Sequence, residues 1–252
     1  MIRDDDFEQS LERVATVLRR AERVCVLTGA GVSAESGVPT FRASDGLWEG
    51  HRIEDVASPF GFERDPRLVW NFYNARRANV KTVLPNPGHF ALVNLEVRWP
   101  GCFTLVTQNV DGLHRVAGTR NLLEIHGSLY RTRCTACSEI VDRGLDALPE
   151  LPMCDCGSML RPDIVWFHEA LPEDIWDAAQ TAASECDVLL VVGTSAIVHP
   201  AASLVPIAKH TRSPGAMVIE VNLAPTEASS LADIGLYGPS GQVLPRLVER
   251  LP

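Results

Sequence analysis

Residues 28–42 read Thr-Gly-Ala-Gly-Val-Ser-Ala-Glu-Ser-Gly-Val-Pro-Thr-Phe-Arg, and they follow the apolar run Val-Cys-Val-Leu at 24–27. The glycines therefore stand where a buried strand ends and a helix begins. Gly29, Gly31 and Ala34 fit the pattern G-x-G-x-x-A. In such a turn, backbone N–H groups and a helix N-terminus approach a pyrophosphate. The stretch predicts a dinucleotide site.

The segment after this turn differs from the usual dehydrogenase pattern. Gly37 and Pro39 cut the helix short. A second strand that ends in a ribose-binding acid would be expected about 20 residues further on, and none is evident. We therefore expect a reaction other than hydride transfer.

Further apolar runs predict buried strands at 102–107, 122–125, 188–193 and 217–222. Helical periodicity marks 6–21, 66–80 and 89–98, whereas 131–162 has neither periodicity nor a long apolar run. Apolar strands separated by helices are typical of a mostly parallel sheet that is covered on both faces. The sequence predicts an α/β fold with a Rossmann-like sheet and a small inserted module at 131–162.

The composition is that of an ordinary globular protein, with 46% hydrophobic and 22% charged residues among 252. The formal net charge of −9 argues against binding nucleic acid through a general electrostatic footprint. No apolar run approaches the roughly 18 residues of a membrane span, and the acidic start does not resemble a signal peptide. We expect a cytoplasmic monomer that binds neither specific nucleic acid nor membranes.

Four of the seven cysteines form two closely spaced pairs, Cys134 with Cys137 and Cys154 with Cys156. Two thiol pairs suit a tetrahedral zinc site, and four sulfur ligands indicate one structural Zn²⁺ per chain rather than a catalytic one. The alternative is unrelated thiols in a loop. The second pair is C-x-C, tighter than the common C-x₂-C. The remaining cysteines lie in or beside apolar segments and are expected in the core: Cys25, Cys102 and Cys186.

Polar residues follow three of the predicted strands. They are Thr107-Gln108-Asn109-Val110-Asp111, Gly193-Thr194-Ser195 and Asn222. Ligands of parallel sheets bind at the carboxyl ends of the strands, although such residues also serve as turn formers and helix caps.

His126 follows the run 122–125, so it is either a base beside that crevice or a structural histidine. The other histidines share no spacing that suggests a ligand set, and we expect them to be surface or supporting groups: His51, His89, His114, His168, His199 and His210.

Taken together, these motifs resemble the sirtuins, which are NAD-dependent protein lysine deacylases. The similarity runs in the family's order from about residue 20 to 245 and is carried by 29–42, 107–111, 124–127, the four cysteines, 165–167 and 193–195. It implies a large Rossmann-like NAD-binding domain of residues 1–42, 89–130 and 163–252. A small domain would consist of a helical insert, 43–88, and a zinc-binding module, 131–162.

The resemblance also implies roles for single residues. His126 resembles the family's general base, with Asn109 beside it as a catalytic residue. Val165, Trp166, Phe167 and Val198 resemble the segments that pair with the substrate backbone. The products would be free lysine, nicotinamide and an O-acyl-ADP-ribose. The residues implied along NAD are Gly29, Ala30, Gly31, Glu35, Phe41, Arg42, Gln108, Asn109, Asp111, Gly193, Thr194, Ser195, Asn222 and Ser240.

Tyr73 and Arg76 are three residues apart and share a helix face. In class III, bacterial-type sirtuins, a Tyr and an Arg at this spacing bind the distal carboxylate of succinyl- or malonyl-lysine. A guanidinium pairs with a carboxylate through two charge-assisted hydrogen bonds, and a tyrosine O–H adds a third donor. The alternative is a solvated arginine beside a core aromatic residue.

His168 stands where the family usually has glycine, directly after Trp166-Phe167.

Two alternative functions of this protein would use the same site. One is protein ADP-ribosyltransfer, and the other is an NAD-binding module without turnover, against which His126 speaks. The main expectation is removal of acidic acyl groups, and of acetyl, from acylated-lysine protein substrates.

Overall fold

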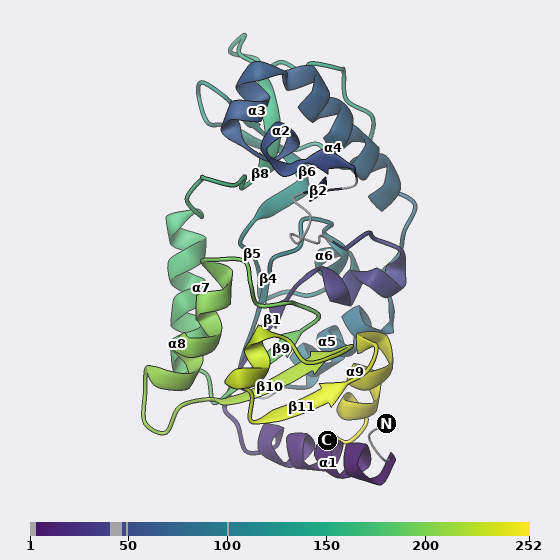
Figure 1. Cartoon of the computed structure of the whole chain (residues 1–252), viewed down its shortest axis with the longest axis vertical. Helices are drawn as coiled ribbons and strands as arrows, with labels where there is room; N and C mark the ends of the chain where they lie inside the picture. The colour runs from purple at the N-terminus through teal and green to yellow at the C-terminus, as the bar shows by residue number, and fades with distance from the viewer. Residues whose placement is uncertain (1–3, 41–46, 49, 100) are drawn as a thin grey trace.

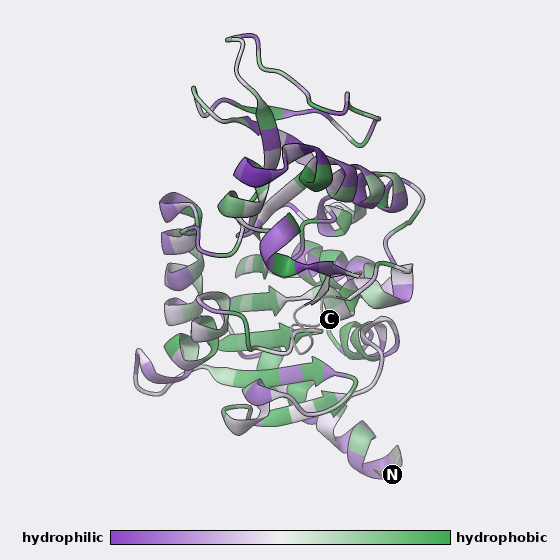
Figure 2. Cartoon of the chain, turned by 45° about the horizontal axis from the view of Figure 1, so that its top comes forward, coloured by the Kyte–Doolittle hydropathy of each residue, from purple (hydrophilic) through white to green (hydrophobic). Residues whose placement is uncertain are grey.

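The computed structural model describes residues 4–40, 47–48, 50–99 and 101–252. Its larger part is built on a six-stranded sheet in the order β11-β10-β9-β1-β4-β5, with every pair parallel. The strands are β1 (Arg23–Thr28), β4 (Cys102–Thr107), β5 (Leu122–Glu124), β9 (Val188–Val192), β10 (Met217–Asn222) and β11 (Ile234–Tyr237). Figure 2 shows that these strands are mainly hydrophobic, as burial on both faces requires.

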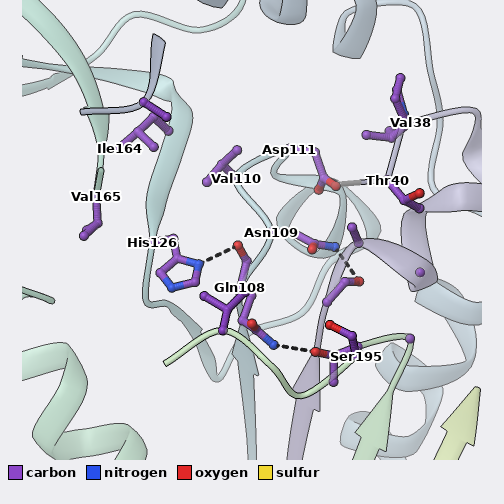
Figure 3. A pocket seen from close by; sticks show the side chains of 18 of the residues that line it. Val38, Thr40, Gln108, Asn109, Val110, Asp111, His126, Ile164, Val165 and Ser195 are labelled. Carbon is purple, nitrogen blue, oxygen red and sulfur yellow. Dashed lines mark hydrogen bonds between the residues drawn. The ribbon is translucent and has the colours of Figure 1, made fainter. Parts of the chain in front are cut away.

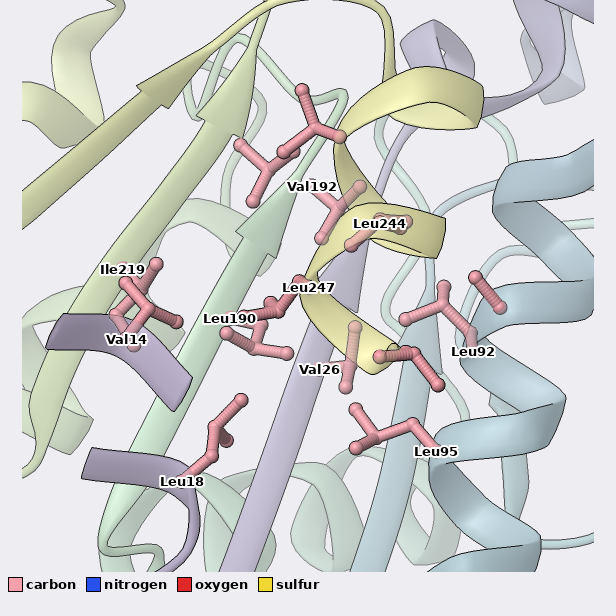
Figure 4. Packing of buried hydrophobic residues seen from close by; sticks show 14 of the residues in the cluster. Val14, Leu18, Val26, Leu92, Leu95, Leu190, Val192, Ile219, Leu244 and Leu247 are labelled. Atoms are coloured by element: carbon pink, nitrogen blue, oxygen red, sulfur yellow. The ribbon is translucent and has the colours of Figure 1, made fainter. Parts of the chain in front are cut away.

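Helices cover both faces of this sheet (Figure 1). One face packs against α1 (Asp4–Leu18), α5 (Pro87–Arg98) and α9 (Ser240–Val248), and the other against α7 (Glu173–Glu185) and α8 (Leu204–His210). The run 24–27 in β1 is continuously apolar because its side chains are buried on both faces of the sheet. Val26 belongs to the first cluster, beside Leu92 and Leu244 (Figure 4), and its neighbour Leu27 belongs to the second. The predicted Rossmann-like α/β fold is confirmed.

A smaller lobe lies at the top of Figure 1. It contains α2 (Ile53–Val56), α3 (Pro59–Arg64) and α4 (Pro66–Val80), with a three-stranded antiparallel sheet of β7 (Ile140–Asp142), β6 (Gly127–Cys134) and β8 (Leu160–Ile164). A separate hydrophobic cluster joins these helices and strands. A short hairpin pairs β2 (Leu47–Trp48) with β3 (His51–Arg52). The exact domain boundaries stay a prediction.

The glycine-rich turn leads into a 3-10 helix, η1 (Ala30–Ser36), and not into the short α-helix expected. Gly37 ends it in the left-handed region, with φ +89°. Gly29 and Gly31 pack directly against the loop after β9. A Cβ on Gly31 would lie 2.7 Å from the carbonyl oxygen of Gly193. These glycines therefore let two loops at the carboxyl edge of the sheet touch each other.

Other expectations were wrong or incomplete. The inserted module at 131–162, for which no strand was predicted, contains β7 and the ends of β6 and β8. Cys102 is exposed and not in the core, although Cys25 and Cys186 are buried. Elements that the sequence patterns did not predict include α7, α8, β11 and α9, together with α6 (Leu113–Ala117), η3 (Ala201–Ser203) and η4 (Glu227–Ser230).

Among the described residues, no helix is both long and apolar enough to cross a membrane. The expected cytoplasmic location and monomeric state stay predictions from the sequence.

Candidate active site

A cavity of about 480 Å³ lies between the carboxyl ends of the large sheet and the smaller lobe (Figure 3). Its wall brings together residues expected from distant parts of the chain. From the NAD set it includes Gly29, Ala30, Gly31, Gln108, Asn109, Asp111, Gly193, Thr194, Ser195 and Asn222, and from the substrate set Tyr73, Arg76, Val165, Trp166, Phe167 and Val198. His126 lines the same cavity. Phe41 and Arg42 lie outside the described residues.

Glu35 and Ser240 do not line this cavity. They contact each other instead, because Ser240 Oγ donates to Glu35 Oε1 at 3.2 Å and the backbone N–H of Gly241 donates to the same oxygen at 2.8 Å. A carboxylate at the N-terminus of α9 satisfies a helix N–H group and complements the helix dipole. Glu35 thus ties η1 to α9, and its expected place along NAD stays a prediction.

His126 is oriented by the backbone that continues from β4. Its Nδ1 lies 3.0 Å from the carbonyl oxygen of Gln108 (Figure 3). A carbonyl only accepts, so Nδ1 carries the proton and Nε2 carries the lone pair. Burial lowers the pKa of His126, and the hydrogen bond to Gln108 only partly opposes this. The imidazole is therefore neutral at pH 7, which is the form that a general base needs.

Gln108 also connects this base to the opposite side of the cavity. Its side-chain Nε2 donates to Thr194 Oγ1 at 2.9 Å, and Asn222 Nδ2 donates to the carbonyl oxygen of Thr194 at 2.9 Å. One chain of hydrogen bonds therefore runs from β10 across the loop after β9 to the loop after β4. The polar residues after three strands act together, as predicted from their place at the strand ends.

Asn109 is held at the glycine-rich turn. Its Nδ2 donates to the carbonyl oxygen of Gly29 and to Ser33 Oγ, each at 3.1 Å. Asp111 is 4% exposed and accepts from the backbone N–H of Leu113 at 2.8 Å. Burial raises the pKa of this carboxyl group. Both residues were expected here, and they join the turn to the wall beside it.

Two histidines lie behind this wall as supporting groups, one of the two roles expected for them. His114 Nε2 lies 3.0 Å from Thr28 Oγ1, His89 Nε2 lies 3.4 Å from Ser33 Oγ, and the two rings pack with centroids 4.8 Å apart. Burial lowers the pKa of His89 to about 4 and that of His114 well below its usual value. Both are neutral and buried, His89 beside Ser33 and His114 beside Thr28, and neither is a surface group. Single histidines in helices give no sequence signal of such a contact.

Tyr73 and Arg76 face the cavity from α4. Tyr73 is fully buried, and its hydroxyl oxygen accepts from Trp166 Nε1 at 2.9 Å. Arg76 is 7% exposed, with its guanidinium carbon 3.4 Å from the centroid of the Phe72 ring. The alternative is therefore wrong for the arginine, whereas Tyr73 is the core aromatic residue that the alternative expected. Arg77 points elsewhere and donates to the backbone carbonyls of Leu129 and Asp146.

The segment 165–168 lines the cavity. The N–H of Val165 donates to the carbonyl of His126 at 2.9 Å, and that of Phe167 donates to the carbonyl of Ala57 at 3.0 Å. His168 has φ +71°, a left-handed conformation that favours glycine. This explains physically why glycine would be the less strained residue at this position.

We expect His168→Gly to stabilise the protein modestly. A non-glycine residue in the left-handed region costs about 1–2 kcal/mol, and glycine gives back about 0.5–1 kcal/mol through its larger unfolded-state entropy. The net gain corresponds to a rise in Tm of about 1–4 °C for a chain of this size, measured by differential scanning calorimetry. A fall in Tm would mean that the edge-on contact of the His168 ring with the Phe60 ring, whose centroids are 6.5 Å apart, stabilises the protein by more than the backbone strain destabilises it.

The four cysteines gather on the smaller lobe, with all four sulfur atoms within 4.8 Å of one another. Cys134 Sγ lies 3.5 Å from Cys156 Sγ, and Cys137 Sγ lies 3.8 Å from Cys154 Sγ. Tetrahedral zinc with bonds of about 2.3 Å places its sulfur ligands about 3.8 Å apart, so this donor set fits the metal. The alternative of unrelated loop thiols is wrong, because the fold brings all four together.

Comparison with known proteins agrees with this geometry. The model of the Sir2 family matches residues 29–200. A Pyrobaculum aerophilum protein named NAD-dependent protein deacylase 2 is 48% identical over 242 residues, covering 94% of each chain. A solved Sir2 homologue in complex with NAD superposes with a TM-score of 0.86 at 44% identity, covering 94% of this chain and 92% of that one. A structure described as Sir2Af2 bound to a myristoylated histone peptide has a TM-score of 0.76 at 35% identity, with 96% of each chain covered.

A glycine-rich turn at the carboxyl edge of a parallel sheet, in one cavity with a neutral imidazole, defines an enzyme that uses a dinucleotide. The extent of the family match then settles the class. The chain belongs to the Sir2 family, and it is an NAD-dependent enzyme.

Proposed function

We propose that this chain is an NAD-dependent protein lysine deacylase whose acyl pocket takes succinyl and malonyl groups as well as acetyl. Deacylation itself is supported by the family match and by relatives named NAD-dependent protein deacylases. The same comparisons do not favour the ADP-ribosyltransferase alternative. The observation that carries the acyl preference is a buried arginine, Arg76, in the wall of the cavity that also contains His126.

The cavity fits NAD because the glycine-rich turn, whose backbone suits a pyrophosphate, lines it together with the polar residues that follow three strands. When bound, NAD supplies the ribose carbon that the acyl oxygen attacks as nicotinamide leaves. Nε2 of His126 then takes a proton from a ribose hydroxyl, since Nδ1 is already committed to Gln108. Asn109 and Asp111 border the space for nicotinamide. The backbone at 165–167, with Val198, pairs with the peptide that carries the lysine.

Tyr73 and Arg76 suit an acidic acyl group for electrostatic reasons. A guanidinium keeps its charge when buried and pairs with a carboxylate through two parallel hydrogen bonds. Burial raises the pKa of Tyr73 above its usual range, so the hydroxyl stays protonated at neutral pH and can donate to a carboxylate. The pair shares one helix face and one cavity wall.

A panel of matched peptides tests this function. The chain is incubated with NAD and with acetyl-, malonyl-, succinyl- and glutaryl-lysine peptides of one sequence, and products are identified by mass spectrometry. We expect nicotinamide, O-acyl-ADP-ribose and free lysine from the succinyl and malonyl peptides, at rates at least equal to that of the acetyl peptide. Turnover of the acetyl peptide alone contradicts the acyl preference, and no nicotinamide release from any peptide contradicts the activity.

We further propose that the four cysteines hold one structural Zn²⁺. Cys134 and Cys154 belong to the same hydrophobic cluster as Trp70 and Tyr73, and Trp70 Nε1 donates to the carbonyl of Leu160 at 2.9 Å. The cysteine module thus packs against the helix that carries the acyl pocket.

Removal of the metal is expected to destabilise the smaller lobe. Since structural zinc contributes folding free energy directly, a strong chelator or Cys156→Ser should lower Tm by about 10 °C or more and reduce activity. Metal content, measured by plasma mass spectrometry, should fall from one zinc per chain. Cys102→Ser is the matched control, since Cys102 is also exposed but lies outside the cluster. Unchanged Tm after complete zinc loss would contradict a structural role.

A further inference from the structure

Glu220 is a fully buried carboxylate in the middle of β10. Burying a carboxylate costs several kcal/mol unless hydrogen bonds replace its hydration. Here three hydroxyls do so: Thr226 Oγ1 donates to Oε1, while Ser229 Oγ and Tyr237 OH donate to Oε2, the last at 3.1 Å. A residue this costly, between the apolar side chains of Ile219 and Val221, calls for a reason beyond packing.

Two of these hydroxyls also organise the next segment. Thr226 Oγ1 accepts from the N–H of Ala228 at 3.2 Å, and Ser229 Oγ accepts from the N–H of Thr226 at 2.8 Å. This is a capping box at the start of η4. Each hydroxyl accepts from the cap and donates to Glu220. The carboxylate therefore ties η4 to β10, and we name Glu220, Thr226 and Ser229 the carboxylate clasp.

The clasp fixes a loop that lines the cavity. Asn222, Leu223 and Thr226 all contribute to its wall. In the sheet order, β10 is four strands away from β5, the strand that precedes His126. Strand β1, which the glycine-rich turn follows, lies between β10 and β5. Strands lie about 4.8 Å apart, so the two ends of this edge are roughly 19 Å apart. With the scissile ribose at His126 and the pyrophosphate at the turn, the second nucleoside of NAD reaches the loop after β10.

We propose that Glu220 is a positioning residue for the adenosine end of NAD, acting through the carboxylate clasp on the loop 222–226. Glu220 itself does not line the cavity, so it acts on the cofactor only through Thr226 and the backbone that Thr226 holds. The inference rests on the proposed function in one respect, which is that NAD is the co-substrate.

The test compares two adjacent serines of η4. Ser229→Ala removes a hydroxyl of the clasp, whereas Ser230→Ala removes an exposed hydroxyl that donates to the carbonyl of Glu227. Loss of one hydrogen bond to a charged group corresponds to about a tenfold change in an equilibrium constant. We expect Ser229→Ala to raise KM for NAD about five- to tenfold, with kcat and the KM for the peptide within about twofold. Ser230→Ala should leave kcat, the KM for NAD and the KM for the peptide unchanged.

Glu220→Gln is expected to raise KM for NAD in the same way, because an amide N–H₂ group cannot accept from the hydroxyls. Thr226→Val should do likewise, and Thr226→Ser, which keeps the hydroxyl, should restore the wild-type value. Circular dichroism establishes that each variant is folded. A folded Ser229→Ala or Glu220→Gln variant with unchanged KM for NAD overturns the inference, as does a loss confined to kcat.

Direct binding separates this inference from the proposed function. ADP-ribose, titrated by calorimetry, should bind the clasp variants about five- to tenfold more weakly than the wild type, and its affinity for Ser230→Ala should be unchanged. If the wild type binds ADP-ribose but deacylates no peptide, the proposed function fails while the clasp is still tested. If the clasp variants bind ADP-ribose as tightly as the wild type, the clasp has no positioning role.

Discussion

Replacing His126 by alanine is expected to lower kcat for deacylation by about 10²- to 10⁴-fold, the usual contribution of a positioned general base. The neutral imidazole presents Nε2 to the cavity because Nδ1 donates to the carbonyl of Gln108. In the proposed mechanism, proton removal from the ribose hydroxyl follows the departure of nicotinamide. Exchange of labelled nicotinamide into NAD, in the presence of an acylated peptide, should therefore persist in His126→Ala.

Deacylated peptide, quantified by mass spectrometry, and nicotinamide exchange, quantified with isotopic label, are measured on the same preparation. His210→Ala is the matched control, because His210 is an exposed residue at the end of α8 and should affect neither reaction. Parallel loss of exchange and deacylation in a folded His126→Ala protein would show that His126 is needed before or during nicotinamide release, against the role proposed for it.

Arg76→Met is expected to separate acidic from neutral acyl groups. Loss of a charge-assisted, bidentate hydrogen bond costs about 2–5 kcal/mol, so kcat/KM for a succinyl peptide should fall by about 30-fold or more. For the acetyl peptide, which has no distal carboxylate, kcat/KM should stay within about threefold. Methionine keeps most of the apolar volume over Phe72, so the helix face is preserved.

Arg67→Met provides the matched control for charge. Arg67 lies on the same helix but is exposed, at 3.4 Å from Glu150, and its loss should leave both peptides unaffected. Arg76→Lys should give an intermediate result, since an ammonium keeps the charge but not the planar pair of donors. Equal losses on succinyl and acetyl peptides would make Arg76 a structural residue of α4, and the acidic-acyl proposal would then be wrong.

Both predictions depend on contacts between the two lobes. Tyr73 in α4 accepts from Trp166, and the residue before Trp166 donates to the carbonyl of His126. The proposed acyl pocket and the proposed base are thus joined through residues 165–166. A change in the cysteine module, which packs against the same α4, should therefore lower the deacylase activity without altering any contact to NAD.

Some of the fold could be predicted because its signal is local. The apolar runs at 102–107 and 217–222 match β4 and β10, and the periodic segment 66–80 matches α4. Strands buried on both faces are mainly apolar, and α4 is marked at its start by Asp65 and Pro66, a capping residue followed by a residue suited to the first turn.

The failures arise where the determining contact is distant. Strands β6 and β8 were missed because neither contains a continuous apolar run, and both include charged side chains such as Arg131 and Asp163. These two pair across the smaller sheet at 2.9 Å. Cys102 begins an apolar run but faces solvent at the start of its strand. The sequence predicts a buried strand at 217–222 but does not show what satisfies Glu220 there, since its partners Ser229 and Tyr237 lie further along the chain.

The sequence alone determined the class of this protein. The order and spacing of the glycine-rich turn, the polar residues after the strands, the histidine and the cysteine pairs are local chemistry that an NAD-consuming site requires. The tertiary structure decided what each side chain does, because function here depends on burial and on contacts between segments far apart in the chain. It buries Arg76 in the wall of the cavity, fixes the tautomer of His126, and encloses the carboxylate of Glu220 in hydroxyls.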